Sequence, residues 1–300
     1  MYIITCFVIY PVKSEKIMKK YVVIGDPVAH SRSPGMQNAA FAVHGLGRPY
    51  DRMLVKAEAF DEFVRFARQE LDGFNLTVPH KSLIIPYLKT IAPAAAAAGS
   101  VNTVTVKDGE FHGDSTDGYG LEMALTRNFG ITPAGKRFVF AGCGGAAHAT
   151  AFHLAEQGAK SIFLANRTVS KAVELAAKIK EFSPEVEVET AAIDDVSRLR
   201  EFFSSADVLI QATSLGLRES DPPPFPLELL EVNRDLCIYD TIYHKTPIQK
   251  RAEELGLKCA DGMWMLIYQG ARSFEIWTGK EAPVEEMLKG FLEDTPCVLH

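Results

Sequence analysis

Short apolar runs alternate with amphipathic stretches through the first third of the chain. The short runs are rich in β-branched and aromatic residues, as buried strands are, and the stretches between them have helical spacing. This alternation predicts an α/β domain built on a mostly parallel sheet. The expected strands are Tyr21–Ile24, Tyr50–Val55, Phe74–Val78 and Val101–Val106, and the expected helices follow Ser33-Pro34, cover Phe60–Glu70, start at Lys81 and cover Ala94–Ala98.

Local signals predict where the first helix and a later hairpin begin and end. Ser33 before Pro34 predicts an N-cap with proline at the first helical position, and Gly45 predicts the end of that helix. Residues 107–110 carry a hairpin turn signal, so the preceding strand is expected to fold back through Phe111.

A second series of strands and helices starts at residue 137. The apolar strand Arg137–Ala141 runs into a glycine-rich turn and a helix that ends near Gly158, and the strand Ser161–Ala165 completes a βαβ unit. This pattern predicts a doubly wound sheet of the Rossmann type. Further strands are expected at Val186–Thr190, Val208–Ala212 and Cys237–Tyr239, and further helices from the capping box at Thr246 to Gly256 and from Met263 to about Thr278.

Composition narrows the class of protein and of partner. The chain has 300 residues, of which 47% are hydrophobic and 23% charged, which is ordinary for a globular protein and long enough for two domains. Its 32 basic and 38 acidic residues give a net charge of −6, without the basic excess that attracts nucleic acid or anionic lipid. A small-molecule partner is therefore expected, with no nucleic acid and no membrane.

Cysteine and histidine spacing predicts neither a disulfide framework nor a metal site. The 5 cysteines are odd in number, far apart and without a C-x-x-C pair, and the 8 histidines form no H-x-x-x-H pair. We therefore expect a protein of the reducing cytoplasm that holds no metal.

Both ends of the chain are expected to be accessory. Residues 1–11 are apolar, but they are about half the ~20 residues that a membrane-spanning helix needs. A second methionine, Met18, precedes the first expected strand. Residues 1–17 are therefore predicted to be dispensable, as an upstream translation start or an accessory edge strand, and residues 295–300 are interpreted as a frayed tail.

The glycine-rich turn predicts a nucleotide site. Gly142, Gly144 and Gly145 lie between a strand and a helix, where backbone N–H groups can approach a pyrophosphate at the helix N-terminus. Because such a turn alone is weak evidence, the residues at the end of the next strand decide the interpretation.

Those residues favour NADP over NAD. An NAD site commonly has Asp or Glu here to bind the ribose 2′-hydroxyl, whereas this chain has Asn166-Arg167-Thr168. The Arg167 guanidinium can pair with a 2′-phosphate through a bidentate fork, and Lys171 adds charge in the first turn of the next helix. Solvated surface charges are the alternative interpretation of these two cations.

Paired polar side chains recur in the first domain. Ser31 and Ser33 are two residues apart, so in an extended segment both point to one side, where two neutral donors can hold a carboxylate. Asn75 and Thr77 repeat the arrangement, and Lys81 follows across a turn that contains a proline.

Two further polar groups stand close to these motifs in the sequence. Asn102 adds an amide, and Asp117 places a carboxylate just before the helix that leads into the nucleotide unit. Each polar residue of the first domain also has a structural interpretation, as a helix cap, a turn former or a surface residue.

Jointly the motifs resemble the shikimate dehydrogenase family, whose members interconvert 3-dehydroshikimate and shikimate with NADPH. The resemblance extends from about Met18 to Gly279. It is carried by Ser31-Arg32-Ser33-Pro34, Asn75-Leu76-Thr77-Val78-Pro79-His80-Lys81, Val101-Asn102-Thr103, Thr116-Asp117-Gly118, Gly142–Gly145, Asn166-Arg167-Thr168, Ala212–Gly216, Asp240–Tyr243 and Gly262–Gln269.

The resemblance implies a role for each motif. Ser31 and Ser33 would bind the substrate carboxylate, and Lys81 and Asp117 would be the catalytic pair. The ring hydroxyls would contact Asn75, Thr77, Asn102 and Gln269, with Tyr243 as a further candidate. The cofactor would contact Gly142, Gly144, Gly145, Ala146, Asn166, Arg167, Thr168 and Lys171, with Thr213, Ser214 and Leu215 on the nicotinamide side and Gly262 and Met265 helping to close the site.

The family's organisation implies two domains and a division of chemistry between them. Residues 18–117 with 264–294 would form the substrate domain and residues 118–263 the NADP-binding domain, in a monomer or homodimer. The Lys81 ammonium would polarise the ring carbonyl and donate a proton to its oxygen. The Asp117 carboxylate would bind a substrate hydroxyl, and its charge would keep the lysine protonated.

The sequence departs from the family pattern at three places, and, separately, two rival functions remain open. Ser115 stands where an asparagine is common, the stretch after Tyr243 is two residues shorter, and Ala146 starts a helix turn without the hydroxyl or arginine sometimes found there. One rival is an NAD-dependent quinate/shikimate dehydrogenase, against which Arg167 argues. The other is a catalytically silent ligand sensor, which would be expected to lack Lys81 or Asp117.

Overall fold

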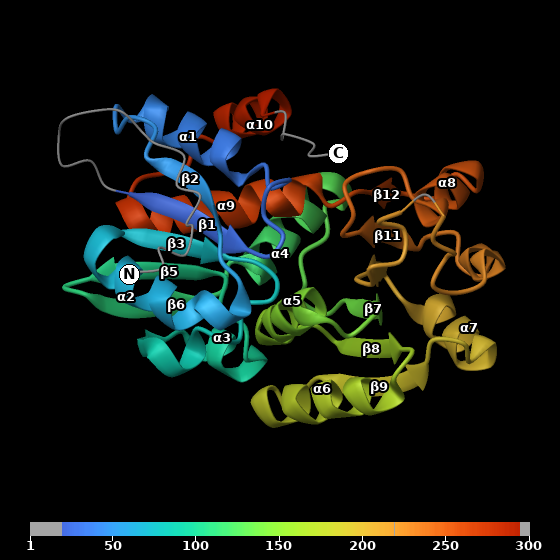
Figure 1. Ribbon diagram of the computed structural model, residues 1–300. Helices are drawn as coiled ribbons and strands as arrows, with labels where there is room; N and C mark the ends of the chain where they lie inside the picture. The colour runs from blue at the N-terminus through green and yellow to red at the C-terminus, as the bar shows by residue number, and fades with distance from the viewer. Residues whose placement is uncertain (1–19, 219, 295–300) are drawn as a thin grey trace. The chain divides into compact units, whose positions relative to one another are not determined.

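The computed structural model describes residues 20–218 and 220–294, which form two compact α/β units (Figure 1). Unit 1 comprises residues 20–116 and 269–294, and unit 2 comprises the described residues of the range 117–268. The predicted dispensable segment 1–17 and the predicted tail 295–300 lie outside the described residues.

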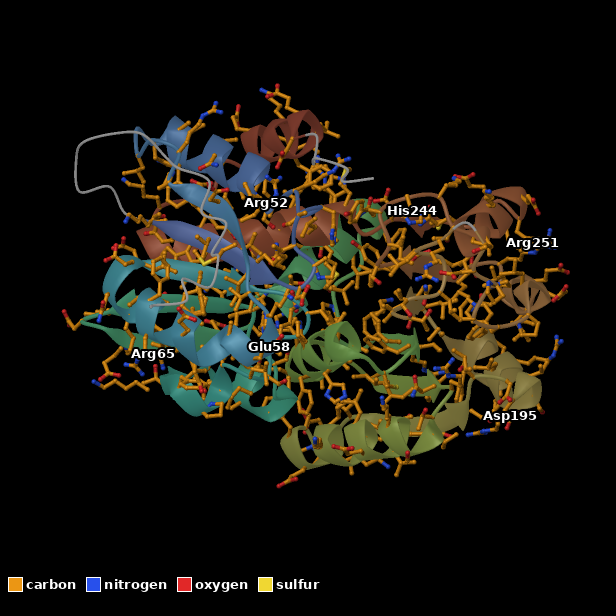
Figure 2. The ribbon with its side chains drawn as sticks, viewed as in Figure 1. Arg52, Glu58, Arg65, Asp195, His244 and Arg251 are labelled. Carbon is orange, nitrogen blue, oxygen red and sulfur yellow. The ribbon has the colours of Figure 1, made fainter. Side chains whose placement is uncertain are left out.

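Unit 1 is built on a six-stranded mixed sheet in the order β2-β1-β3-β5-β6-β4. The pairs β1–β2, β1–β3 and β4–β6 are parallel, and β3–β5 and β5–β6 are antiparallel. Arg52 lies on the edge strand β2 (Figure 2). The strands are β1 (Tyr21–Gly25), β2 (Tyr50–Leu54), β3 (Gly73–Leu76), β4 (Leu88–Ile91), β5 (Thr103–Lys107) and β6 (Glu110–Asp114). The helices are α1 (Ser33–Val43), α2 (Phe60–Glu70), α3 (Pro93–Ala98), the Gln269-onward part of α9 (Met263–Thr278) and α10 (Val284–Glu293), with 3-10 turns at Ala57–Ala59 and Ile85–Tyr87.

Aromatic side chains fill both faces of this sheet. On one face Tyr21 packs against Phe41 of α1 and Trp277 of α9, with ring centroids 5.0 and 4.9 Å apart. On the other, Phe74 meets Phe63 of α2 edge to face at 5.1 Å. Each buried ring removes a large apolar area from water, so the sheet is held between two packed layers.

Two sequence predictions about unit 1 are wrong, and two elements were not predicted. No α-helix starts at Lys81: turns lead to the 3-10 turn Ile85–Tyr87, because the chain directly after it is extended by pairing with β6 as β4. Ser33 is the first residue of α1 rather than its N-cap, which is Arg32. In unit 1 the sequence patterns missed the strand β4 and the helix α10, and in unit 2 they missed the short strand Cys259–Ala260.

Unit 2 is a doubly wound sheet, as predicted, with strand order β12-β11-β10-β7-β8-β9 and parallel pairing throughout. The strands are β7 (Arg137–Ala141), β8 (Ser161–Asn166), β9 (Glu187–Ala192), β10 (Val208–Gln211), β11 (Cys237–Asp240) and β12 (Cys259–Ala260). The helices are α4 (Asp117–Phe129), α5 (Gly145–Glu156), α6 (Val169–Phe182), α7 (Val196–Ser205), α8 (Pro247–Glu254) and the start of α9, with a 3-10 turn at Leu227–Glu231.

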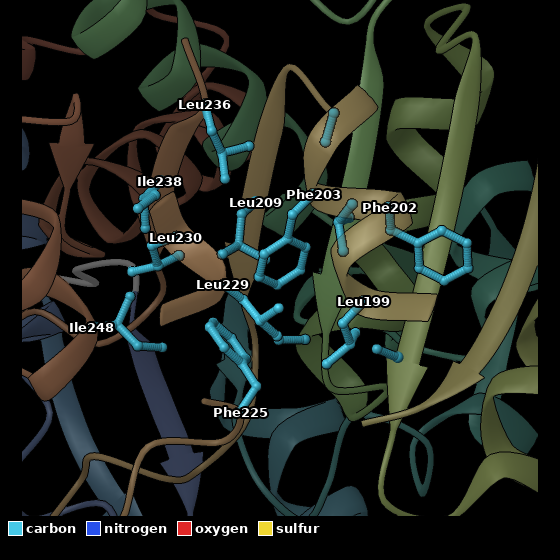
Figure 3. Packing of buried hydrophobic residues seen from close by; sticks show 14 of the residues in the cluster. Leu199, Phe202, Phe203, Leu209, Phe225, Leu229, Leu230, Leu236, Ile238 and Ile248 are labelled. Carbon is cyan, nitrogen blue, oxygen red and sulfur yellow. The ribbon is translucent and has the colours of Figure 1, made fainter. Parts of the chain in front are cut away.

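The strand order reverses between β7 and β10, which are adjacent in the sheet. A sheet of this kind binds ligands outside the carboxyl ends of the strands at such a switch point. Its frame is rigid, because one face packs on a continuous apolar cluster that includes Phe202 and Phe203 of α7, Leu209 of β10 and Ile248 of α8 (Figure 3).

Candidate functional site

The glycine-rich turn of unit 2 contains one glycine that the backbone fold requires, Gly142, and two that it does not, Gly144 and Gly145. Gly142 has φ +105°, and a Cβ there would lie 2.8 Å from Cγ2 of Thr213. At Gly144 and Gly145, by contrast, no heavy atom of the described residues beyond their chain neighbours lies within 4 Å of the position a Cβ would take. The space above these two glycines is therefore open to a ligand that approaches the backbone.

The start of α5 adds backbone donors to this open space. Gly144 is the N-cap and Gly145 the first helical residue, and within the described part of the chain no side chain caps this helix end. The first N–H groups of a helix have no partner within the helix and carry the positive end of its dipole. The turn therefore fits the pyrophosphate of a dinucleotide.

The carboxyl ends of β7, β8 and β10 meet around this turn. The Asn166 Oδ1 atom accepts a hydrogen bond of 3.2 Å from the Cys143 amide, and its Nδ2 donates to the carbonyl of Thr168. Burial raises the pKa of the Cys143 thiol to about 12, so this side chain stays a neutral packing residue. The structure thus brings together the glycine turn, Asn166 and Thr213, which come from three separate motifs.

The two predicted phosphate-binding cations lie in the expected place. Arg167 directly follows β8 and Lys171 lies in the first turn of α6; both are exposed. Neither side chain forms an ion pair or hydrogen bond with another residue of the described ranges. An anion that reaches this corner would meet two cations without a competing carboxylate partner.

A buried amide organises the loop after β10, and sequence reasoning missed it. Gln211 Oε1 accepts from the Thr213 amide at 2.7 Å, its Nε2 donates to the Leu215 carbonyl at 3.0 Å, and the Leu215 amide donates to Thr213 Oγ1. Ser214 lies exposed between them. The signal was a lone polar residue at the end of an apolar strand, where a ligand-facing loop needs a fixed anchor.

The loop after β11 is held in the same way by Asp240. Its two carboxylate oxygens accept from the Ile242 amide at 3.0 Å and from the Thr246 hydroxyl at 2.6 Å, and burial raises the pKa of this carboxyl. Tyr243 is exposed on this loop. At Gly262 a Cβ would lie 2.1 Å from the carbonyl oxygen of residue 241, so only glycine fits where α9 begins.

The start of α9 is tied to the sheet of unit 2. The backbone amide of Met265, whose side chain is buried, donates to the Tyr239 hydroxyl at 3.2 Å. Ala146, in the first turn of α5, is partly buried. Contact of Met265 and Ala146 with the cofactor therefore remains a prediction.

In unit 1 the predicted serine pair is formed. The Ser31 hydroxyl donates to the Ser33 hydroxyl at 3.1 Å and accepts from the Ser33 amide at 3.3 Å. Both side chains lie at the N-terminus of α1, so their hydroxyls and the helix dipole favour an anion at the same point.

The amides predicted to bind ring hydroxyls meet in one buried network. Asn75 accepts from the Tyr50 hydroxyl at 2.6 Å and donates to the Asn102 carbonyl at 3.0 Å. The Asn102 amide group donates to Gln269 Oε1 at 3.2 Å, and its oxygen accepts from the Thr116 amide at 2.9 Å. Residues from four motifs are thus joined within unit 1.

Thr103 and Ser273 complete this network, and sequence reasoning missed both. Their hydroxyls lie 2.7 Å apart, and each also accepts a hydrogen bond of 3.1 Å from the amide group of Asn75. Ser273 also donates to the Gln269 carbonyl. A signal for Ser273 exists in the sequence, because it follows Gln269 by four residues and so shares one helix face with it.

The segment that carries Thr77 and Lys81 is anchored at both ends. The Thr77 amide donates to the Ile24 carbonyl at 2.9 Å, and the Val101 amide donates to the Lys81 carbonyl at 2.9 Å. The backbone of Lys81 is therefore fixed next to Val101, which starts the Asn102 motif just before β5. Asp117, the first residue of α4, is buried and follows Thr116 of the network directly in the chain.

Comparison with known proteins identifies the family. Residues 23–104 match the shikimate dehydrogenase substrate binding domain, residues 124–216 match the shikimate / quinate 5-dehydrogenase family, and residues 262–289 match the shikimate 5′-dehydrogenase C-terminal domain. The chain is 39% identical over 274 residues to the shikimate dehydrogenase (NADP(+)) of Methanopyrus kandleri, covering 90% of this chain and 93% of that protein. The chain belongs to the shikimate dehydrogenase family.

Solved structures of shikimate dehydrogenases have the same fold. The enzyme of Thermus thermophilus in complex with NADP(H) and shikimate is 32% identical, with a TM-score of 0.80 over 92% of this chain and 99% of that one. The enzyme of Listeria monocytogenes in complex with shikimate and NAD is 32% identical, with a TM-score of 0.85 over 93% of this chain and 98% of that one. The predicted fold class, of two α/β units with a Rossmann-type sheet, is therefore confirmed.

This shikimate dehydrogenase family member has neither a membrane-spanning helix nor a metal-binding cluster among its described residues. Within the described residues, none of the helices combines the length and the apolar character needed to cross a membrane. The same part of the chain brings together no group of three or more His, Cys, Asp or Glu side chains that could hold a metal ion.

Proposed function

We propose that this protein catalyses the reversible NADPH-dependent reduction of 3-dehydroshikimate to shikimate. The observation that carries the proposal is the buried network of unit 1, which joins Asn75, Asn102 and Gln269 beside the anchored Lys81 segment. A network with fixed donors and acceptors suits a rigid polyol with several hydroxyls. The 39% identity to an NADP(+)-dependent shikimate dehydrogenase supports the same substrate.

The chain's residues would divide the work between the two units. Ser31 and Ser33 hold the substrate carboxylate, and the network residues with Thr77 hold the ring. NADPH, when bound, supplies the hydride that the carbonyl carbon accepts. Lys81 polarises the carbonyl oxygen and gives it the proton that completes the alcohol, and Asp117 accepts a hydrogen bond from a substrate hydroxyl.

The residues of unit 2 fit NADP(H). The open space above Gly144 and Gly145 accepts the pyrophosphate at the start of α5. Arg167 and Lys171 would bind the 2′-phosphate, and the Thr213-Ser214-Leu215 loop would line the nicotinamide side. On the resemblance that the motifs carry, Tyr243 would contact the substrate and Ala146 the cofactor, and Gly262 and Met265 would help to close the cofactor site.

An absorbance assay of reduced nicotinamide tests substrate and cofactor together. The protein is mixed with shikimate or quinate and with NADP⁺ or NAD⁺, and reduction of the cofactor is followed. We expect kcat/KM with shikimate and NADP⁺ to exceed that of each other combination by at least about tenfold. The preference for NADP⁺ over NAD⁺ is expected because two cations meet the 2′-phosphate. A preference for NAD⁺ or for quinate would support the quinate dehydrogenase alternative, and no turnover would support the silent sensor.

The remaining expectations concern the state of the protein in the cell. The proposal includes a cytoplasmic monomer or homodimer that binds no nucleic acid and has a dispensable segment 1–17. Size-exclusion chromatography with light scattering measures the oligomeric state, and mass spectrometry of the native protein shows where the chain starts.

A further inference from the structure

The start of α1 is stabilised by a residue from the other end of the chain. Its N-cap residue, Arg32, makes no side-chain cap within the described chain, and the first turn contains no acidic residue. Instead Oδ2 of Asp294, which follows α10, accepts a hydrogen bond of 3.0 Å from the amide of Gly35. A carboxylate at a helix N-terminus satisfies an orphan donor and complements the dipole.

Two glycines allow Asp294 to reach this position. A Cβ at Gly35 would lie 2.3 Å from the Gly290 carbonyl oxygen and 2.4 Å from Cβ of Asp294, so α1 and α10 touch backbone to backbone here. Figure 1 shows the two helices side by side. This close approach brings the end of α10 to the start of α1.

Arg52 connects Asp294 to the serine pair. Its Nη2 lies 2.5 Å from Oδ2 of Asp294, and its Nε donates to the Ser31 carbonyl at 2.6 Å. The two side chains are only 24% and 16% exposed, so this ion pair is screened less than a surface pair. In Figure 2 Arg52 lies on the side of unit 1 that carries α1 and α10.

We propose that Arg52 and Asp294 are positioning residues that set the affinity for the substrate carboxylate. They fix the backbone of Ser31 and the first turn of α1, and with them the two hydroxyls. The inference rests on the proposed function, in which these hydroxyls hold a carboxylate. It adds that the end of the chain, outside every motif of the family resemblance, controls substrate recognition.

Charge balance gives the proposal a distinctive pattern of effects. Arg52 neutralises the charge of Asp294, so that the carboxylate of the substrate can also approach the start of α1. If Arg52 is removed, Asp294 remains as an uncompensated negative charge and repels the substrate. If both are removed, the repulsion disappears and only the loss of positioning remains.

Steady-state kinetics of the full-length protein with shikimate and NADP⁺ tests this pattern. We expect Arg52→Met to raise the KM for shikimate about tenfold and Asp294→Ala to raise it a few-fold, on the scale of one charged hydrogen bond. The double variant should bind shikimate at least as well as Arg52→Met alone. The KM for NADP⁺ and kcat should stay within about twofold. The lost contacts hold residues assigned to the substrate carboxylate, not those assigned to the cofactor or to proton transfer.

Two controls separate positioning from loss of fold. Asp195 caps α7 of unit 2 by accepting from the Arg198 amide at 3.1 Å, so Asp195→Ala removes a matched cap away from the serine pair and should leave the KM for shikimate unchanged. Shikimate methyl ester lacks the charge, so its KM should change much less than that of shikimate. If Arg52→Met does not fold, as judged by its thermal midpoint, Arg52→Lys and Asp294→Asn take its place.

Distinct results overturn the two proposals. A wild-type protein without activity on shikimate would overturn the proposed function and this inference with it. An active wild type whose variants keep their KM for shikimate, or raise the KM of acid and methyl ester equally, would overturn the inference alone.

Discussion

The two units prepare their binding sites in opposite ways. In unit 1 the amide side chains assigned to the substrate, Asn75, Asn102 and Gln269, are buried and belong to one hydrogen-bonded network. In unit 2 the glycine turn presents backbone donors beneath open space, and the cations Arg167 and Lys171 point to no protein partner among the described residues.

The difference reflects what each ligand requires. A ring with several hydroxyls is distinguished from its isomers only by donors and acceptors at fixed places, so its site must be pre-organised. A pyrophosphate and a 2′-phosphate are recognised by charge and by close backbone approach, which glycines and long cationic side chains provide. The first two predictions below therefore each affect one ligand and spare the other, and the last two compare the stability of the parts that hold them.

The largest effect is expected from the loss of the proton donor in unit 1. Lys81→Met should lower kcat by about 10²–10⁴, the usual contribution of a general acid, because the developing alkoxide then has no donor. Cofactor affinity, measured by calorimetric titration with NADP⁺, should be unchanged. The exposed Lys89 on β4 offers a matched control, since Lys89→Met should keep full turnover. Unchanged kcat in Lys81→Met would contradict the mechanism.

The corresponding change in unit 2 affects selectivity. Arg167→Gln with Lys171→Gln should lower the preference for NADP⁺ over NAD⁺, in kcat/KM, by about 10- to 100-fold, because charged contacts to the 2′-phosphate are lost. The KM for shikimate should not move. Lys180→Gln, near the other end of α6, removes an exposed cation from the same helix and serves as the control. Equal loss with both cofactors would mean that the cations do not read the 2′-phosphate.

A smaller effect separates the glycine that the fold needs from the one that the ligand needs. Gly142→Ala places a Cβ 2.8 Å from Thr213 at φ +105°, so it should lower the free energy of unfolding by about 1–3 kcal/mol. Gly144, with φ −84° and open space, accepts alanine without strain. Gly144→Ala should therefore keep the thermal midpoint and weaken NADP⁺ binding about tenfold, since the added methyl separates phosphate from backbone. A lower thermal midpoint in Gly144→Ala, with unchanged stability in Gly142→Ala, would contradict these two roles.

The fold was predictable where its signals are local. The strand Arg137–Ala141 and the helix Phe60–Glu70 have the predicted bounds, because the spacing of hydrophobic residues marks both and Gly142 directly follows the strand. The false helix at Lys81 and the missed strand β4 depend on pairing with β6, more than twenty residues away, which no local pattern encodes.

The site was predictable as a set of motifs but not as a network. The hydroxyl pair Ser31 and Ser33 followed from a spacing of two, and the structure brings them together. The partners of Asn75 lie up to 198 residues away, at Ser273. Gln211 acts on its own loop, and its signal, a lone polar residue at the end of an apolar strand, was overlooked because it is a single position rather than a spaced pair.

The smallest effect is a pH dependence that distinguishes the two units. His80, between Thr77 and Lys81, is fully buried; its Nε2–H donates to the Val55 carbonyl at 2.7 Å, and its ring stacks on Phe60. Burial lowers the pKa of His80 below its ordinary 6.5. The unfolded chain therefore takes up the proton first, so the stability that neutral His80 contributes is present above pH 6.5 and is lost as the pH falls below it.

The two tryptophans allow this to be measured unit by unit, because Trp264 lies in unit 2 and Trp277 is buried in unit 1. In a Trp264→Phe variant, urea unfolding followed by fluorescence reports on unit 1, and its midpoint should fall between about pH 7 and pH 5.5. His80→Gln keeps a donor for Val55 but cannot take up the proton, so it should flatten this slope. Burial raises the pKa of Asp114 and of Asp240, so these carboxyls favour the folded state as the pH falls toward about 4 and cannot produce the expected loss. If the slope persists in His80→Gln, the pH sensitivity of unit 1 lies elsewhere than in the turn that positions Lys81.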